Sequence, residues 1–149
     1  AVRSGASVPD IGTVEAFIHT LLEADSIAYS ASASGTYLST ELFPRLEIAD
    51  QVADKSLRVV GERVGTVVAR GEAAIGFQQV SELLPIAGIT YVGTIPDEIQ
   101  KVTIFSAGIT TRARNRDAAK ALIDFLASPR AAPTIAETGM EPRTPGWRR

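Results

Sequence analysis

The sequence contains no cysteine and a single histidine among its 149 residues. Without cysteine the chain forms no disulfide, has no thiolate nucleophile and lacks a common ligand of structural zinc. With one histidine a multi-histidine metal site is impossible, and a Ser-His-Asp triad would depend on His19 alone. His19 lies beside the apolar stripe of its predicted helix, so we expect it to face solvent. The sequence therefore implies no metal and no other cofactor.

A strong excess of either charge is also missing. There are 15 Lys and Arg against 17 Asp and Glu, a net charge of −2. This balance does not favour nucleic-acid binding, which needs a basic face. No run of about 18 apolar residues is present, so no membrane span is predicted. The length suffices for one domain with a core and is too short for two domains of ordinary size.

The sequence does contain alternating helix and strand patterns. Apolar residues at helical spacing predict helices over 13–22, around 38–46 with a break at Pro44, and over 117–126. Short apolar runs predict strands over 26–30, 57–60, 74–77, 89–92 and 102–109. This alternation favours an α/β fold with a mostly parallel sheet flanked by helices on both faces.

The loop that follows the first predicted strand is the strongest candidate site. Ligands bind open α/β sheets beyond the carboxyl ends of the strands, and the loop lies at such an end. Its small residues let backbone N–H groups approach a ligand, and the hydroxyls of Ser32, Ser34 and Thr36 can donate hydrogen bonds, with Gly35 between them. The alternative is that these serines only cap the following helix.

Two further loops lie at predicted strand ends. Gly61 allows close backbone approach, whereas Glu62 would repel an anion in the same cleft and so favour a neutral or cationic ligand group; the alternative is a solvated acid in the first turn of a helix. Gln78 and Gln79 follow a buried strand, and their amides can bind a polar ligand. Because strand side chains alternate in direction, we expect only one of the two to face any cleft.

Several blocks of the chain together resemble a known family. The most specific are ARGEAAIG at 69–76 and DAAKALIDFLASP at 117–129. Their order and spacing over roughly 13–142 is similar to that of the molybdate-type extracellular solute-binding proteins of ABC importers. The resemblance implies a type II periplasmic-binding-protein fold, in which two α/β lobes close over a ligand without catalysis. It also implies a periplasmic or extracellular location.

The same resemblance divides the chain. Residues 1–12 would end the first strand that crosses between lobes, and 13–101 would form the second lobe. Residues 102–140 would hold the second crossing strand and the C-terminal helices of the first lobe, and 141–149 a tail. The N-terminal half of the first lobe would then be absent, and we expect weak ligand binding by this chain alone. The C-terminal helices would expose apolar surface and could form a homo-oligomer.

The family's ligand residues can be carried over position by position. Ser34 and Gly35 match its backbone-donor loop, and Gly61 matches its second helix-start donor. Gln79 stands where molybdate binders usually have a tyrosine, which together with Glu62 disfavours molybdate and tungstate. The ligand would then be another small polar solute or oxyanion held at Ser32, Ser34, Gly35, Thr36, Gly61, Glu62 and Gln79.

We therefore expect a non-enzymatic binding protein of an ABC uptake system. Its partners would be the small-molecule ligand and a membrane permease, and not nucleic acid. Two alternatives are the ligand-sensing domain of a transcription regulator and a truncated interaction domain that binds no ligand. An enzyme is least favoured, because there is one histidine and no cysteine.

Overall fold

The computed structural model describes residues 1–142. The chain divides into two compact units, Ala1–Val102 and Thr103–Arg149. The predicted tail lies largely outside the described residues. Within the described residues, no helix has the length and apolar character needed to cross a membrane.

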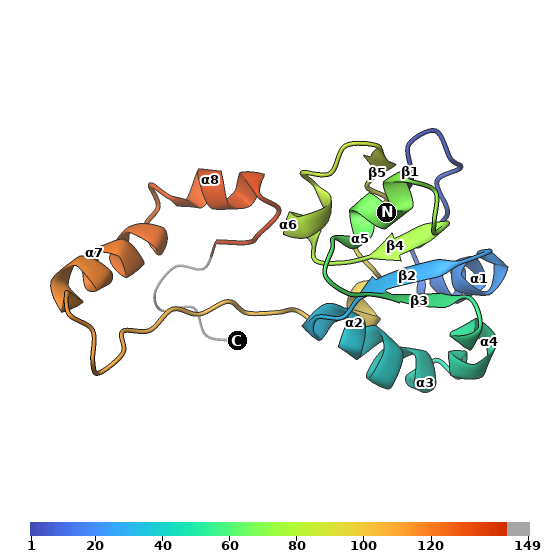
Figure 1. Ribbon diagram of the computed structural model, residues 1–149, viewed down its shortest axis with the longest axis horizontal. Coiled ribbons are helices and arrows are strands. Elements are labelled where there is room, and N and C mark those ends of the chain that lie inside the picture. Colours follow the sequence, from blue (N-terminus) through green and yellow to red (C-terminus); the bar gives the residue numbers. More distant parts are fainter. Residues whose placement is uncertain (143–149) are drawn as a thin grey trace. The chain divides into compact units, whose positions relative to one another are not determined.

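A five-stranded mixed sheet forms the centre of the first unit (Figure 1). The strands are β1 (Val2–Arg3), β2 (Ile27–Ser30), β3 (Ser56–Val59), β4 (Ile75–Phe77) and β5 (Ile89–Thr90). They lie in the order β3-β2-β4-β1-β5. β2 is parallel to β3 and β4, whereas β1 is antiparallel to β4 and β5. Four strands therefore share one direction and β1 runs against them.

The expectation of a mostly parallel sheet thus holds for four strands, and β1 makes the sheet a mixed one. The exception is β1, two residues long, which pairs Val2 with both Ile75 and Thr90. The backbone on each side adds to this pairing, because Ser4 donates to the Gly88 carbonyl at 2.9 Å. A two-residue strand has no periodicity to detect, so the sequence pattern did not reveal it.

Helices cover both faces of this sheet, as predicted. Residues of β2 alternate between the two cores: Ile27 and Tyr29 pack on one face and Ala28 on the other. One face carries α1 (Val14–Glu23), α2 (Ala33–Tyr37), the π-helical turn η1 (Leu38–Leu42), α3 (Phe43–Arg45) and α4 (Ala49–Ala53). The other carries α5 (Val64–Ala69). Two short helices complete the unit, α6 (Val80–Leu83) and the 3-10 turn η2 (Asp97–Ile99).

The helix predicted around 38–46 contains a wide turn before its proline. The Phe43 N–H donates to the carbonyl of Leu38, five residues earlier, which defines the π-helical turn. Pro44 has no N–H, and its ring would clash with the carbonyl four residues before it in a regular helix. The helical run ends at Arg45, one residue later. The predicted break at Pro44 is therefore confirmed.

The second unit contains α7 (Arg116–Leu126) and α8 (Ala132–Glu137). No residue of either helix is buried. The apolar residues of α7 are thus not covered, and Leu122 is 58% exposed. The strand predicted over 102–109 is wrong, since this stretch has no regular structure and Phe105 is 70% exposed. Strand-forming residues make a strand only where a neighbouring strand accepts their hydrogen bonds.

Candidate functional site

A pocket of about 320 Å³ opens at the carboxyl ends of β2, β3 and β4. This volume lies at the lower end of the range of roughly 300–1,000 Å³ typical of small-molecule sites. Ligands bind at this end of parallel strands because the loops that leave them converge there. The lining side chains used below are Ser30, Ser32, Glu62, Arg63, Gln78 and Glu82.

Three serine hydroxyls meet at the end of β2. The Ser30 Oγ lies 2.7 Å from that of Ser32 and 3.2 Å from that of Ser34. Ser30 is 5% exposed, so its hydroxyl is held almost wholly by its neighbours. Ser32 is the N-cap of α2, yet its side chain makes no capping bond. Simple capping therefore does not account for this serine, whose hydroxyl belongs to the cluster.

Gly35 lets α2 approach the end of β2. A Cβ at this position would lie 1.7 Å from the Ser30 carbonyl oxygen and 2.9 Å from the Ser30 nitrogen. Real side chains do not tolerate such distances, so only glycine fits. The close approach brings Ser34, one residue earlier, within reach of Ser30.

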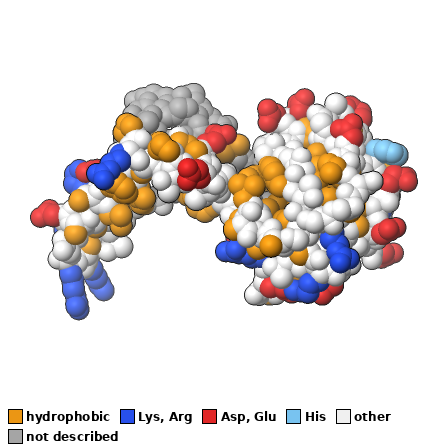
Figure 2. Space-filling view, turned by 90° about the horizontal axis from the view of Figure 1, so that it is seen from above, with side chains coloured by type: hydrophobic (Ala, Val, Ile, Leu, Met, Phe, Trp, Pro, Cys, Tyr) orange, Lys and Arg blue, Asp and Glu red, His pale blue; other side chains and the backbone are white. Residues whose placement is uncertain are grey.

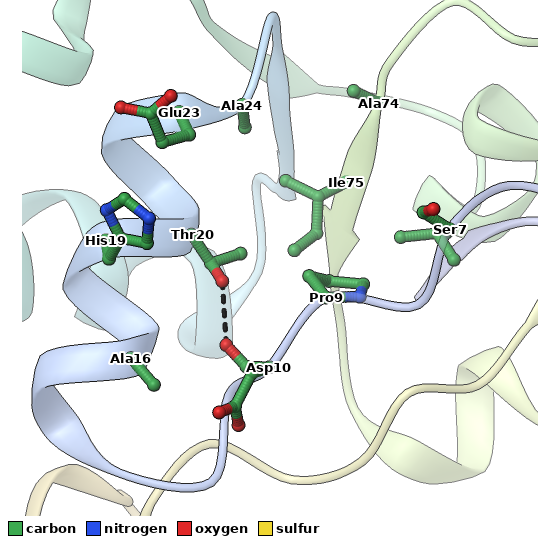
Figure 3. Close-up of a pocket in the computed structure, with 11 residues that line it drawn as sticks. Ser7, Pro9, Asp10, Ala16, His19, Thr20, Glu23, Ala24, Ala74 and Ile75 are labelled. Atoms are coloured by element: carbon green, nitrogen blue, oxygen red, sulfur yellow. Dashed lines mark hydrogen bonds between the residues drawn. The ribbon is translucent and has the colours of Figure 1, made fainter.

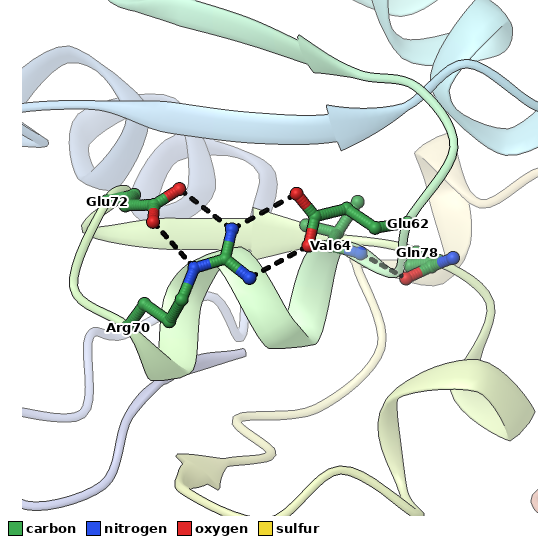
Figure 4. A network of polar contacts seen from close by, with 5 residues as sticks. All are labelled: Glu62, Val64, Arg70, Glu72 and Gln78. Atoms are coloured by element: carbon green, nitrogen blue, oxygen red, sulfur yellow. Dashed lines mark hydrogen bonds and ion pairs between the residues drawn. The ribbon is translucent and has the colours of Figure 1, made fainter.

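The loop after β3 differs from its prediction. Helix α5 begins at Val64 with Arg63 as its N-cap, so Glu62 precedes the helix instead of lying in its first turn. Gly61 has φ +82°, a left-handed conformation that favours glycine, and a Cβ there would meet nothing within 4 Å. Its role is thus to turn the chain rather than to allow close approach. The Val64 N–H donates to Gln78 Oε1 at 2.8 Å, so a side chain of this protein already occupies this helix-start donor (Figure 4).

Glu62 is paired with an arginine instead of standing alone. Its carboxylate accepts two hydrogen bonds from Arg70, at 2.8 and 3.0 Å, and Arg70 also binds Glu72 (Figure 4). The hydrogen bond from Arg70 holds the pKa of Glu62 below its usual value, and the same cause lowers the pKa of Glu72. All three side chains are about half exposed. The repulsion of anions expected from Glu62 is therefore largely compensated.

Two pocket residues are less well paired. Arg63 has no carboxylate partner within ion-pair distance in the described part of the chain, and its side chain is exposed to solvent. In the same part of the chain, the Glu82 Oε2 atom is buried and has no hydrogen-bond partner. The pocket therefore offers one unpaired cation and one carboxylate with an unused oxygen.

The structure brings only part of the predicted site together. Ser32, Gly61 and Glu62 line the pocket, and Ser34 joins it through the serine cluster. Gly35 is buried behind that cluster, and the Thr36 side chain is exposed outside the pocket.

Of the two glutamines, Gln78 lines the pocket, whereas Gln79 is the N-cap of α6. One glutamine faces the pocket, as expected, but it is Gln78 and not Gln79, the residue carried over from the family. Sequence reasoning missed Ser30, Arg63 and Glu82. Ser30 ends a predicted strand, Arg63 follows the loop at 61–62, and Glu82 lies shortly after Gln78 and Gln79. Only these positions in the sequence could have suggested them.

A second hollow of about 410 Å³ lies at the opposite end of β4, between α1 and the N-terminal loop (Figure 3). His19 and Glu23 lie at its edge on α1, and Thr20 Oγ1 donates to the Asp10 carbonyl at 2.7 Å. His19 is exposed, as predicted (Figure 2). This hollow is lined by Ala74 and Ile75 at the start of β4, away from the strand ends where α/β sheets bind ligands.

Comparison with known proteins gives the family. The model of the bacterial extracellular solute-binding protein family matches residues 1–141. The chain belongs to this family. A curated relative, aconitate isomerase from Pseudomonas sp, is 49% identical over 142 residues, which cover 95% of this chain and 54% of the relative. The chain thus spans about half the length of that protein. No solved structure matches it significantly.

These findings confirm a solute-binding family with an α/β fold, and the family's description is extracellular. They overturn two expectations. A non-enzymatic chain and an ABC uptake function were expected, but the relative at 49% identity is named as an enzyme. The physical reason for the error is that a fold does not fix function, which depends on the groups placed in its site. The absence of histidine pairs and cysteine excluded some chemistries but not those of carboxylates.

Proposed function

We propose that the chain forms part of an isomerase that acts on a small unsaturated polycarboxylate, with aconitate as the first substrate to test. The observation that carries this proposal is the 49% identity to an aconitate isomerase over 142 residues. Such similarity along 95% of the chain includes the strand ends and loops around the pocket.

The chemistry of aconitate suits the groups in the pocket. Aconitate is a three-carbon chain with a carboxylate on each carbon and one carbon–carbon double bond. A proton leaves the CH₂ carbon, the electron pair spreads over the three carbons, and a proton returns to the other terminal carbon. The double bond moves, its geometry can change, and no atom or electron is gained or lost. The step needs a base and groups that bind carboxylates.

The pocket contains both kinds of group. Arg63 can pair with a substrate carboxylate, since guanidinium matches the carboxylate geometry. The hydroxyls of Ser30 and Ser32 can donate hydrogen bonds to a second one. Because one cation does not balance three carboxylates, we propose that this pocket is one wall of a two-lobed cleft, as in the molybdate-type proteins that the sequence resembles.

The test is interconversion of cis- and trans-aconitate by the whole protein, followed through the vinyl proton signals in NMR spectra. We expect the same final mixture from either isomer, because an enzyme does not alter an equilibrium. Binding of aconitate by calorimetry without any interconversion would contradict the proposal.

Arg63→Gln is the variant that tests the carboxylate contact. We expect KM to rise by about tenfold with a smaller change in kcat, because loss of a charged hydrogen bond weakens binding of substrate and transition state alike. Initial rates over a range of substrate concentrations give both constants. An unchanged KM would remove Arg63 from the site.

A further inference from the structure

The pocket holds two carboxylates, and their surroundings differ. Glu62 receives two hydrogen bonds from the Arg70 guanidinium, and its side chain is 43% exposed. The hydrogen bonds from Arg70 lower the pKa of Glu62 and so make it a weaker base toward a C–H group. Arg70 also binds Glu72, which fixes the guanidinium in place. Glu62 is therefore held as part of an ion-pair network (Figure 4).

Glu82 has the opposite character. It lies on α6, just beyond β4, and lines the same pocket. Its Oε2 atom is buried and accepts no hydrogen bond within the described residues, so the carboxylate can turn this oxygen toward the pocket without breaking a bond to it. An unsatisfied carboxylate oxygen costs free energy in the resting protein, and a cost of this kind is typical of functional sites. Arg63 lies in the same pocket and can hold a substrate carboxylate near it.

Taking the proposed isomerase as given, we infer that Glu82 is the catalytic base that removes the proton from the CH₂ carbon of the substrate and returns one to the other end of the three-carbon unit. In the first half of the step the C–H bond breaks, an O–H bond forms on Glu82, and the electron pair stays on the substrate. In the second half the O–H bond breaks and a new C–H bond forms. Glu82 ends as the carboxylate with which it began, so the proton count balances.

This assignment separates the roles of the pocket's charged groups. Glu82 moves the proton, and Arg63 holds a carboxylate. Glu62 stays bonded to Arg70 and does not touch the reacting carbon. Ser30 is buried, and its hydroxyl adds an uncharged polar group to the pocket wall.

The experiment compares Glu82→Gln with Glu62→Gln in the whole protein, in D₂O. Wild-type protein should isomerise aconitate and exchange its CH₂ hydrogens for deuterium. Glu82→Gln should lose at least about 100-fold in kcat and lose the exchange equally, because both need the same proton removal. It should still bind aconitate by calorimetry. Glu62→Gln should lose much less, and Glu15→Gln on the exposed face of α1 should leave the rates unchanged.

The outcomes distinguish the two proposals. If wild-type protein does not isomerise aconitate, the proposed function fails. If it does and Glu82→Gln keeps the exchange, or Glu62→Gln loses it instead, only the assignment of Glu82 is overturned. If Glu82→Gln does not fold, Glu82→Asp provides the test: binding with little turnover supports the assignment, and turnover near the wild-type rate overturns it.

Discussion

At the scale of single residues, Gly35 has the least room for a side chain among the glycines of the described residues. Its hydrogen atom occupies the only space between α2 and the Ser30 carbonyl, where a Cβ would lie 1.7 Å from the oxygen. The serine cluster depends on this approach, because Ser34 precedes Gly35 and reaches Ser30 at 3.2 Å. The geometry of the pocket wall thus depends on a residue that does not line the pocket.

We predict that Gly35→Ala lowers the free energy of unfolding by about 2 kcal/mol or more, because the backbone must move to accept the methyl group. Urea unfolding followed by circular dichroism measures this change. Gly12→Ala is the matched control: its Cβ would meet only the end of the exposed Asp10 side chain, at 3.3 Å, so we expect a change within about 0.5 kcal/mol. Equal stability of both variants would show that α2 can move away at little cost.

At the scale of elements, α1 and α7 form a natural pair for comparison. They have 10 and 11 residues. Each begins with a side-chain cap at 3.1 Å, Thr13 to the Ala16 N–H and Asn115 to the Ala118 N–H. They differ in burial, since α1 buries Phe17 and Leu21 whereas α7 buries nothing. The two helices thus match in length and in capping, and they differ in tertiary packing.

We predict that backbone amides of α7 exchange with solvent at least about tenfold faster than those of α1 in the 149-residue chain. Helices of this length are marginal in water without packing, so α7 should open locally far more often. Hydrogen exchange followed by NMR resolves the two helices. Equal protection in dilute solution would contradict the prediction. Protection of α7 that appears only at high concentration would support the homo-oligomer expected from its apolar face (Figure 2).

Most elements of the first unit could be predicted from sequence, and the reason is local. Helix α1 follows its apolar periodicity, and strands β2, β3 and β4 follow their short apolar runs, within a few residues. The loop at 31–36 was found because it lies between two such signals. The segment 102–109 failed because its apolar residues met no neighbouring strand. Propensity describes what a segment can form, whereas pairing decides what it does form.

At the scale of the whole molecule, the site could be predicted only in part. Ser30, Arg63 and Glu82 stand far apart in the chain and meet because β2, β3 and β4 lie side by side. No spacing in the sequence records that meeting. The sequence patterns also did not indicate an enzyme. A proton shift needs only a carboxylate and a few hydrogen-bond donors, which every soluble protein contains. Histidine and cysteine counts exclude particular mechanisms and leave this one open.

The position of β1 has a consequence for how the sheet assembles. Among the described strands β5 pairs only with β1, and β1 joins residues 2 and 3 to partners near residues 75 and 90. Pairing β2 with β3 closes a loop of moderate length. Pairing β1 with β4 and β5 closes most of the unit into a single long loop. Closing a longer loop costs more chain entropy, and folds rich in such distant contacts form more slowly. The strand pairs with the largest sequence separation in this sheet are therefore the ones made by β1, one of its two shortest strands.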